Sequence, residues 1–318
     1  MDNIFLIIGG GFGLYGYLPA VMLGGYQVLL PRLYQEKILA RPELIPYFSK
    51  IRWTDDWEGA LPECNSVIIA LPPSEQFYWV QRCLKFRNIK RVVLEKPVAV
   101  DAVSAKKTLG LIKSAGLDFR ISYLFFYADW WASVTNLINT GASGKIAIDW
   151  SFMAHHYSKN VVNWKRIITF GGGVTKFYGI HLMALAAYHG YDDVLTSKVF
   201  SSVSNEAEKW EVVFSGKNLP ALEMNINSRS PVERFLINFQ SFVDLKNKIE
   251  IVNFSHPFES GDVHINNSDF RVSYLCKLLD SFVESGDLLN NKYYNWCDKI
   301  LELWQIIEQK TSVDLHNN

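Results

Sequence analysis

A glycine-rich segment near the amino terminus has the composition of a phosphate-binding turn. Residues 9–16 read GGGFGLYG and follow an apolar run at residues 4–8, the pattern of a buried parallel strand. Because glycines lack Cβ atoms, backbone N–H groups at the start of a helix can approach a pyrophosphate closely. Two registers of the GxGxxG pattern compete: one begins at Gly11, and the other begins at Gly9 and places Leu14 in the third glycine slot. The order of strand, turn and helix predicts a dinucleotide site with cofactor contacts at Gly9, Gly11, Phe12 and Gly13.

A basic residue follows the second expected strand, at residues 26–30. Sites selective for NAD usually carry an acid at this point, which binds the ribose hydroxyls. This chain has Pro31 and Arg32 there, and no acid occurs until Glu36. A guanidinium can instead accept the 2′-phosphate of NADP. The sequence therefore favours NADP as the cofactor and leaves open both NAD and a merely solvated Arg32.

Another strand end carries a lysine that could donate to a reacting oxygen. Lys96 belongs to the run LEKP at residues 94–97, which closes the expected strand at residues 91–94. In doubly wound folds, ligands bind outside the carboxyl ends of the strands, where an ammonium group can stabilise a developing alkoxide. The alternative is an exposed lysine paired with Glu95 or another carboxylate.

The elements that position these residues can be predicted from alternating apolar runs and amphipathic stretches. The expected strands are residues 4–8, 26–30, 66–70, 91–94 and 119–123, and the expected helices are residues 14–23, 75–86 and 103–114. Pro19 should distort or shorten the first helix. This βαβ alternation predicts an α/β fold that begins with a Rossmann domain, a doubly wound parallel sheet, over residues 1–122.

The pattern changes after about residue 124. Expected strands at residues 150–154, 199–203, 210–214, 221–226 and 235–238 are interrupted by one obvious helix at residues 175–188, and helical spacing returns at residues 272–283 and 294–309. Alternating apolar and polar positions suit an antiparallel sheet. We expect residues 123–318 to form an α/β domain with a large open, mostly antiparallel sheet for substrate binding and oligomerisation. Its C-terminal helices could pack back on the first domain.

Composition and charge exclude several classes of protein. The 32 basic residues balance 32 acidic ones, without the basic excess of a nucleic-acid-binding protein, and 49% of the residues are hydrophobic, which excludes disorder. The four cysteines form no CxxC pair, and the adjacent His155 and His156 are expected on opposite faces of a strand, so we expect no metal site. No apolar run reaches the ~18 residues of a membrane helix, and a signal peptide is not evident. We expect a cytoplasmic protein that binds neither membrane nor nucleic acid.

Several motifs together resemble the glucose–fructose oxidoreductase and inositol dehydrogenase (Gfo/Idh/MocA) family. They are the EKP tripeptide at residues 95–97, ALPP at residues 70–73, the triple glycine at residues 171–173, GIH at residues 179–181, and Trp164. The resemblance covers nearly the whole chain. It implies a nicotinamide-dependent hydride transfer at a hydroxyl or keto carbon of a sugar, cyclitol or nucleotide-linked sugar. It also implies a homodimer or homotetramer, paired through an apolar face of the second-domain sheet.

The resemblance assigns roles to individual residues. Catalytic groups would be Lys96, which bonds the reacting oxygen, and His181. Apart from the resemblance, Tyr178 lies three residues before His181 and could share the proton transfer. Further cofactor contacts would be Leu71, Pro72, Glu95, Lys96 and Tyr123. Substrate contacts would be Lys96, Trp164, Phe177 and His181. Residues 125–127, FFY, lack the Arg of many relatives and predict a more aromatic pocket.

The second-domain motif departs from the family pattern, GGGxLxDxGxHxxD. Phe177 stands at the first Asp position and Ala184 at the last, so His181 lacks its carboxylate partner. An apolar neighbour should lower the pKa of that histidine. Alternatives to an oxidoreductase are therefore a non-catalytic NAD(P)-binding regulator and an imine or tetrapyrrole reductase. Lys165 and Arg166 could reach a phosphate of a nucleotide-linked sugar or could be a solvated pair.

Overall fold

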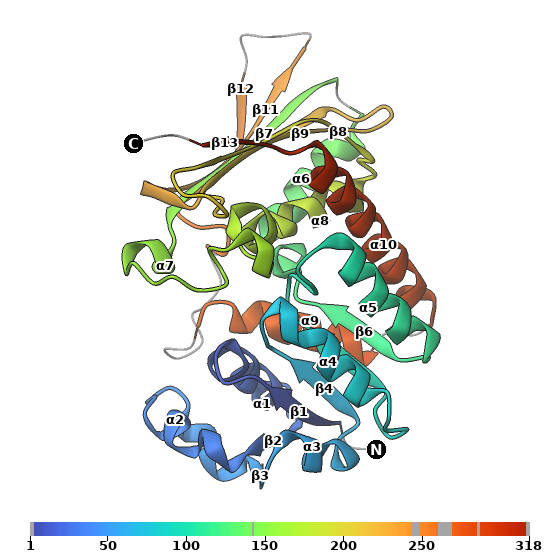
Figure 1. The fold of residues 1–318 in the computed structure, drawn as a ribbon. Coiled ribbons are helices and arrows are strands. Elements are labelled where there is room, and N and C mark those ends of the chain that lie inside the picture. Colours follow the sequence, from blue (N-terminus) through green and yellow to red (C-terminus); the bar gives the residue numbers. More distant parts are fainter. Residues whose placement is uncertain (1–2, 142, 243–247, 260–268, 285–286, 316–318) are drawn as a thin grey trace. The chain divides into compact units, whose positions relative to one another are not determined.

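A computed structural model describes residues 3–141, 143–242, 248–259, 269–284 and 287–315 (Figure 1). The chain divides into two compact units. The first comprises Met1–Ala99, Ala105–Leu124 and Gly261–Asn290, and the second comprises Val100–Ser104, Phe125–Ser260 and Asn291–Asn318. Each unit contains one sheet, and the two units are described separately.

The first unit contains a six-stranded sheet in the order β3-β2-β1-β4-β5-β6, and all neighbouring strands are parallel. The strands are β1 (Ile4–Ile8), β2 (Gln27–Pro31), β3 (Arg52–Thr54), β4 (Ser66–Ile69), β5 (Arg91–Leu94) and β6 (Asp118–Ile121). Runs of Ile, Val and Leu are buried on both faces of the sheet, as parallel sheets require. The strand order reverses between β1 and β4, where doubly wound folds bind ligands. The predicted Rossmann-like sheet is confirmed, and β3 is a short strand that was not predicted.

Short helices connect these strands. They are η1 (Gly13–Tyr17), α1 (Leu18–Leu23), η2 (Arg32–Tyr34), α2 (Gln35–Leu39), η3 (Ile45–Lys50), α3 (Trp57–Ala60), η4 (Leu61–Glu63), α4 (Pro73–Cys83) and α5 (Ala102–Ser114). The predicted first helix divides into the π-helix η1 and the helix α1, in whose first turn Pro19 lies. The Leu18 N–H still donates to Gly13 O in η1, so Pro19 lies where the π-helix changes into α1. Later in the chain, α9 (Val272–Glu284) packs beside α1 in the same unit (Figure 1).

The second unit contains a seven-stranded sheet in the order β12-β11-β7-β10-β9-β8-β13. The strands are β7 (Gly144–Met153), β8 (Asp193–Ser201), β9 (Lys209–Ser215), β10 (Ala221–Asn227), β11 (Arg229–Ser241), β12 (Lys248–Phe254) and β13 (Ser312–Leu315). β10 pairs with β7 in parallel and β13 pairs with β8 in parallel, whereas the other pairs are antiparallel. The predicted mostly antiparallel sheet is confirmed.

The helices of the second unit are more numerous than predicted. They are η5 (Leu124–Tyr127), α6 (Asp129–Asn139), α7 (His155–Ser158), η6 (Ile168–Phe170), η7 (Val174–Tyr178), α8 (Ile180–His189) and α10 (Asp287–Lys310). Placing His155 and His156 in a strand was wrong, because β7 ends at Met153 and the two residues begin α7. There His155 is exposed and His156 is buried.

The expected apolar outer face of this sheet is not found on its central strands. On β10, Leu222, Met224 and Ile226 are buried, and the alternating positions between them are polar. Glu223 pairs with Lys145 of β7 at 3.0 Å, and Asn225 donates to Asp149 of β7 at 2.9 Å. That expectation was therefore wrong for β7 and β10, since charged and amide groups occupy the half-buried face. Among the described helices, none combines the length and apolar character needed to cross a bilayer.

Candidate functional site

The glycine turn in the first unit has one position that only glycine can occupy. Gly9 follows β1 directly with φ +136°, and a Cβ there would overlap the carbonyl oxygen of Ala70 at the end of β4. At Gly11 the situation is the reverse. A Cβ built on Gly11 meets no atom within 4 Å, and the residue is exposed. The turn therefore packs tightly against β4 at its first residue and is open at its third.

These contacts favour the register of the motif that begins at Gly9. A Cβ on Gly13 would lie 3.0 Å from Ile7 Cγ2 and 3.4 Å from Ala70 Cβ, so Gly13 allows close packing of helix on strand. Leu14, in the third glycine slot of this register, is buried. The helix begins with the Leu14 N–H donating to Gly11 O at 2.9 Å. Gly9 therefore allows the tight turn, Gly11 leaves the backbone open to a ligand, and Gly13 allows the helix to pack closely on the strand.

A residue far along the chain packs on this turn. The Arg271 guanidinium lies 4.2 Å from the ring centroid of Phe12, and its Nε and Nη2 donate to the two Asp269 oxygens at 2.8 Å and 2.7 Å. The paired carboxylate raises the pKa of Arg271, although burial opposes it. This contact was not predicted, because nothing in the sequence of residues 269–271 indicates a partner near residue 12.

Arg32 lies at the carboxyl end of β2, as predicted, but it already has an acidic neighbour. Its Nε is 3.3 Å from Asp55 Oδ1, and the two side chains are 60% and 94% exposed. Asp55 follows β3, whose Thr54 pairs with Pro31, so the parallel register brings the two residues together. An ion pair this exposed contributes little stability, so the guanidinium stays available to a ligand.

The EKP turn follows β5 in the same unit, with half-buried Glu95 and Lys96 and a cis peptide bond between Lys96 and Pro97. The buried Tyr17 hydroxyl donates to Glu95 Oε1 at 2.7 Å and also bonds the Ser122 hydroxyl. Burial, and next the Glu95 charge, raise the pKa of Tyr17, so the phenol stays protonated and can donate. The Glu95 carboxylate is thus held from η1.

The other predicted cofactor contacts of this unit also lie at strand ends. Leu71 and Pro72 are half-buried directly after β4, and Tyr123 is buried just after β6. The carboxyl ends of neighbouring parallel strands share one edge of a sheet. The glycine turn and these strand ends therefore lie along the same edge of the first-unit sheet.

In the second unit, three predicted residues form one aromatic group. The Phe177 ring lies 5.3 Å from Trp164 and 4.7 Å from Tyr178, both nearly perpendicular, and Lys165 Nζ is 5.3 Å from its centroid. η7 supplies Phe177 and Tyr178, and the loop before η6 supplies Trp164. Where the family pattern has an acid, this chain therefore has an aromatic surface under a cation.

His181, on α8, has different aromatic neighbours. It is 4% exposed, and its ring stacks on Phe125 with centroids 4.5 Å apart and also contacts Phe258 at 6.5 Å. Tyr178 packs instead on Phe152 at 4.7 Å. Lys96 belongs to the first unit and these residues belong to the second.

His156 also belongs to the aromatic group, which the sequence did not predict. Its buried ring stacks on Tyr178 with centroids 6.2 Å apart. Burial, followed by the charges of Lys165 and Arg166, lowers the pKa of His156 to about 4. The imidazole is therefore neutral at neutral pH. The signal was hidden because His156 was assigned to a strand rather than to α7.

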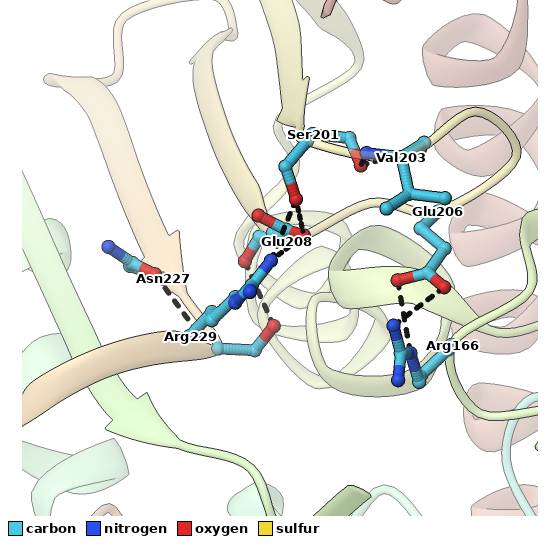
Figure 2. A network of polar contacts seen from close by, with 9 residues as sticks. Arg166, Ser201, Val203, Glu206, Glu208, Asn227 and Arg229 are labelled. Atoms are coloured by element: carbon cyan, nitrogen blue, oxygen red, sulfur yellow. Dashed lines mark hydrogen bonds and ion pairs between the residues drawn. The ribbon is translucent and has the colours of Figure 1, made fainter. Parts of the chain in front are cut away.

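Arg166 is not available to a phosphate, because a buried carboxylate binds it. Its Nε and Nη2 lie 3.0 Å and 2.9 Å from the two Glu206 oxygens, and both side chains are at most 10% exposed (Figure 2). Nearby, Arg229 pairs with Glu208 at 2.7 Å and with Ser202. The interpretation of Arg166 as a solvated or phosphate-binding residue was therefore wrong. Among the described residues, no group of three or more His, Cys, Asp or Glu side chains gathers as metal ligands would.

No family model matches the sequence, and no curated protein matches it significantly. Solved structures do match over nearly the whole chain. A super-repressor mutant of Gal80p from Saccharomyces cerevisiae has a TM-score of 0.73 at 12% identity, over 97% of this chain and 95% of that one. The WlbA dehydrogenase from Bordetella pertussis, solved with NADH and UDP-GlcNAcA, has a TM-score of 0.72 at 11% identity, over 97% and 96%.

A third match is KijD10, a 3-ketoreductase from Actinomadura kijaniata solved with NADP and TDP-benzene. Its TM-score is 0.68 at 11% identity, over 99% of this chain and 100% of that one. The fold is the one that these solved structures share. The fold that the sequence motifs implied is thus supported by structures whose sequences are only distantly similar to this chain.

Proposed function

We propose that this chain is an NAD(P)-dependent oxidoreductase. Its reaction would be a hydride transfer to or from a carbonyl or hydroxyl carbon of a sugar, cyclitol or nucleotide-linked sugar. The observation that carries the proposal is the glycine turn, closed against Ala70 at Gly9 and open at Gly11, beside the point where the strand order reverses. Similar folds solved with NADH, NADP and sugar nucleotides or their analogues support it.

The bound dinucleotide would supply or accept the hydride. Of the chain's own groups, Lys96 Nζ would donate a hydrogen bond to the reacting oxygen and stabilise its negative charge. His181 would give or take the proton or anchor the substrate, and Tyr178 could share the proton transfer. Without an acid at Phe177 the imidazolium form of His181 is poorly supported, so Lys96 is the principal polar group.

The cofactor proposed is NADP, with NAD as the alternative. Arg32 is mostly exposed at the carboxyl end of β2, where a 2′-phosphate would lie, and its weak pairing with Asp55 can be exchanged for a phosphate. The same Asp55 could accept hydrogen bonds from ribose hydroxyls, as NAD-selective sites require, once Arg32 moves aside. Whether Arg32 or Asp55 contacts the ribose would determine the selectivity between NADP and NAD.

The substrate proposed has an apolar or flat face. Trp164, Phe177 and Tyr178 present ring edges and faces of the kind that stack on sugar rings. Arg166 is engaged by Glu206, and Lys165, which lies over the Phe177 ring, would contact the phosphate of a nucleotide-linked sugar. Residues 1–122 would bind the cofactor and residues 123–318 the substrate. The chain would form a homodimer or homotetramer through the second-unit sheet, with polar contacts contributing.

Two observations favour a second candidate, a non-catalytic NAD(P)-binding regulator. Phe177 replaces the acid of the family's proton relay, and one similar structure is a repressor mutant. A regulator would bind the dinucleotide and turn over no substrate. Lys96→Met would then change only ligand or partner binding.

Differential scanning fluorimetry tests the proposal directly. NAD, NADH, NADP and NADPH would be added first, followed by UDP- and TDP-linked sugars with the best dinucleotide. A ligand at 100 times its Kd stabilises the native state by about 2.7 kcal/mol, a shift of several degrees in Tm. A Tm raised by a dinucleotide and raised further by a sugar nucleotide supports the enzyme. No shift with any dinucleotide at millimolar concentration refutes both candidates.

A further inference from the structure

A buried glutamine joins two strand-end turns of the first unit. Gln76 is the fourth residue of α4 and is fully buried, and its Nε2 lies 3.0 Å from Glu95 O, 3.0 Å from Pro97 O and 3.3 Å from Leu71 O. Helical side chains lean toward the helix N-terminus, which here faces the carboxyl ends of β4 and β5. One amide therefore bonds both the ALPP turn and the EKP turn.

The three carbonyls determine the orientation of this amide. With the nitrogen toward them, its two N–H groups serve three acceptors, whereas the flipped amide would place an oxygen against three oxygens. The Gln76 Oε1 is buried and has no hydrogen-bond partner among the described residues. A buried polar atom without a hydrogen-bond partner lowers the stability of the fold. The hydrogen bonds that Nε2 donates, rather than any bond to Oε1, therefore hold the Gln76 amide in place.

We propose that Gln76 is the positioning residue for Lys96. Glu95 O and Pro97 O belong to the residues on either side of Lys96, so the amide fixes the main chain from which the lysine side chain departs. The Glu95 carboxylate is fixed separately by the Tyr17 hydroxyl. The EKP turn is thereby held at its main chain by α4 and at its side chain by η1. This inference rests on the proposed function for the role of Lys96.

Such a role predicts a specific kinetic effect. Lys96 Nζ stands at the end of a flexible side chain, and a misplacement of about 1 Å at a reacting group can cost on the order of a hundredfold in rate. Loss of the Gln76 donor should therefore lower kcat while KM for the dinucleotide changes by less than about threefold.

Three substitutions separate the donor from the volume of the side chain. Gln76→Met keeps the length and removes the N–H groups, Gln76→Glu keeps the shape and replaces the donor by an acceptor, and Gln76→His retains a ring N–H donor. Val80→Ala is the matched control, because Val80 is fully buried one turn further along α4. It removes buried volume from α4 and takes no hydrogen-bonding group from either turn.

Hydrogen exchange gives a readout that needs no ligand. The Glu95 N–H bonds Ile69 O at 3.2 Å, so its exchange rate reports opening of the EKP turn. We expect exchange at Glu95, relative to the slowest amides of the sheet, to rise at least tenfold in Gln76→Met. The increase should be larger in Gln76→Glu, and below about threefold in Gln76→His and Val80→Ala. The volume of the side chain alone would not produce this order.

The outcomes distinguish this inference from the proposed function. Exchange in Gln76→Met equal to that in Val80→Ala overturns the positioning role, whether or not a dinucleotide binds. If exchange follows the expected order but wild-type protein binds no dinucleotide, the proposed function fails, and Gln76 is shown to hold the turn for another purpose. With a substrate, kcat lowered equally by Gln76→Met and Gln76→His would also contradict the role of the donor.

Discussion

Gly11 offers a substitution that should abolish cofactor binding without harming the fold. A Cβ on Gly11 meets nothing within 4 Å, and its φ lies outside the left-handed region, so valine there strains neither packing nor backbone. The open space is where a pyrophosphate would approach the turn. Gly13→Val is less informative, since its Cβ would press on Ile7 and Ala70 and would destabilise the unit itself.

The magnitude follows from the bonds that a side chain at Gly11 would displace. Backbone N–H groups that bind a phosphate make charge-assisted hydrogen bonds, and losing two of them at ~1.5 kcal/mol each costs ~3 kcal/mol. Gly11→Val should therefore raise the Kd for the preferred dinucleotide at least about a hundredfold. Its Tm should stay within about 3 °C of wild type, because an exposed change of this kind rarely exceeds a kcal/mol.

Isothermal titration and thermal unfolding measure these two quantities on the same samples. Gly110→Ala is the control, because Gly110 lies inside α5 and a Cβ there also meets nothing within 4 Å. It should bind the dinucleotide as wild type does and gain slightly in stability. Wild-type affinity in Gly11→Val would refute the placement of the pyrophosphate at this turn. A Tm lowered by ten degrees or more would refute the claim that Gly11 is structurally free.

Three further predictions concern other groups. Arg32→Ala should weaken NADPH by about 2 kcal/mol and NADH much less, measured by titration, and equal losses would show that Arg32 does not contact the 2′-phosphate. Once a substrate is known, Lys96→Met should lower kcat a few hundredfold, a loss of about 3–4 kcal/mol in transition-state stabilisation, and should change cofactor affinity by no more than severalfold. His181→Asn should lower kcat by less. Turnover by Lys96→Met at the wild-type rate would remove the catalytic assignment of Lys96. Burial holds the pKa of His156 at about 4, below the ~6.5 of an unfolded chain, so the stability this histidine contributes is present above pH 6.5 and is lost as pH falls toward 4. Urea unfolding at pH 7 and pH 5 should show a loss larger by ~1–2 kcal/mol in wild type than in His156→Gln, and identical losses would contradict this cause.

The sequence predicted the parts of the first unit that are encoded locally. Continuous apolar runs identified β1, β4 and β5 nearly to the residue, because strands buried on both faces are almost entirely apolar. The glycine turn was recognisable because the positive φ at Gly9 favours glycine, and a glycine can be read directly from the sequence. Both features are visible in the local sequence, although the packing of Gly9 on Ala70 is not.

The contacts that support the site could not be predicted in this way. Gln76 reaches carbonyls 19 and 21 residues away, and Tyr17 reaches a carboxylate 78 residues away. Arg271 packs on the glycine turn from the other end of the chain. Such partners are set by the tertiary fold, and one sequence carries no periodic signal of them.

The second unit shows a different limitation. His156 was assigned to a strand because it follows an alternating run, yet β7 stops at Met153 and a single helical turn buries the imidazole beside Tyr178. Arg166 looked solvated because its partner, Glu206, lies 40 residues further along the chain. Short helices and buried ion pairs are hard to predict because the residues around them have no distinctive composition.

The proposed function requires that the glycine turn binds a nicotinamide dinucleotide. Isothermal titration of the wild-type chain with NADPH and with NADH, using Gly11→Val as the blank, tests this most directly. We expect saturable binding of one dinucleotide per chain, tighter for NADPH, and no heat of binding in Gly11→Val. Absence of saturable binding to either dinucleotide at millimolar concentration, in protein that unfolds cooperatively, would contradict it.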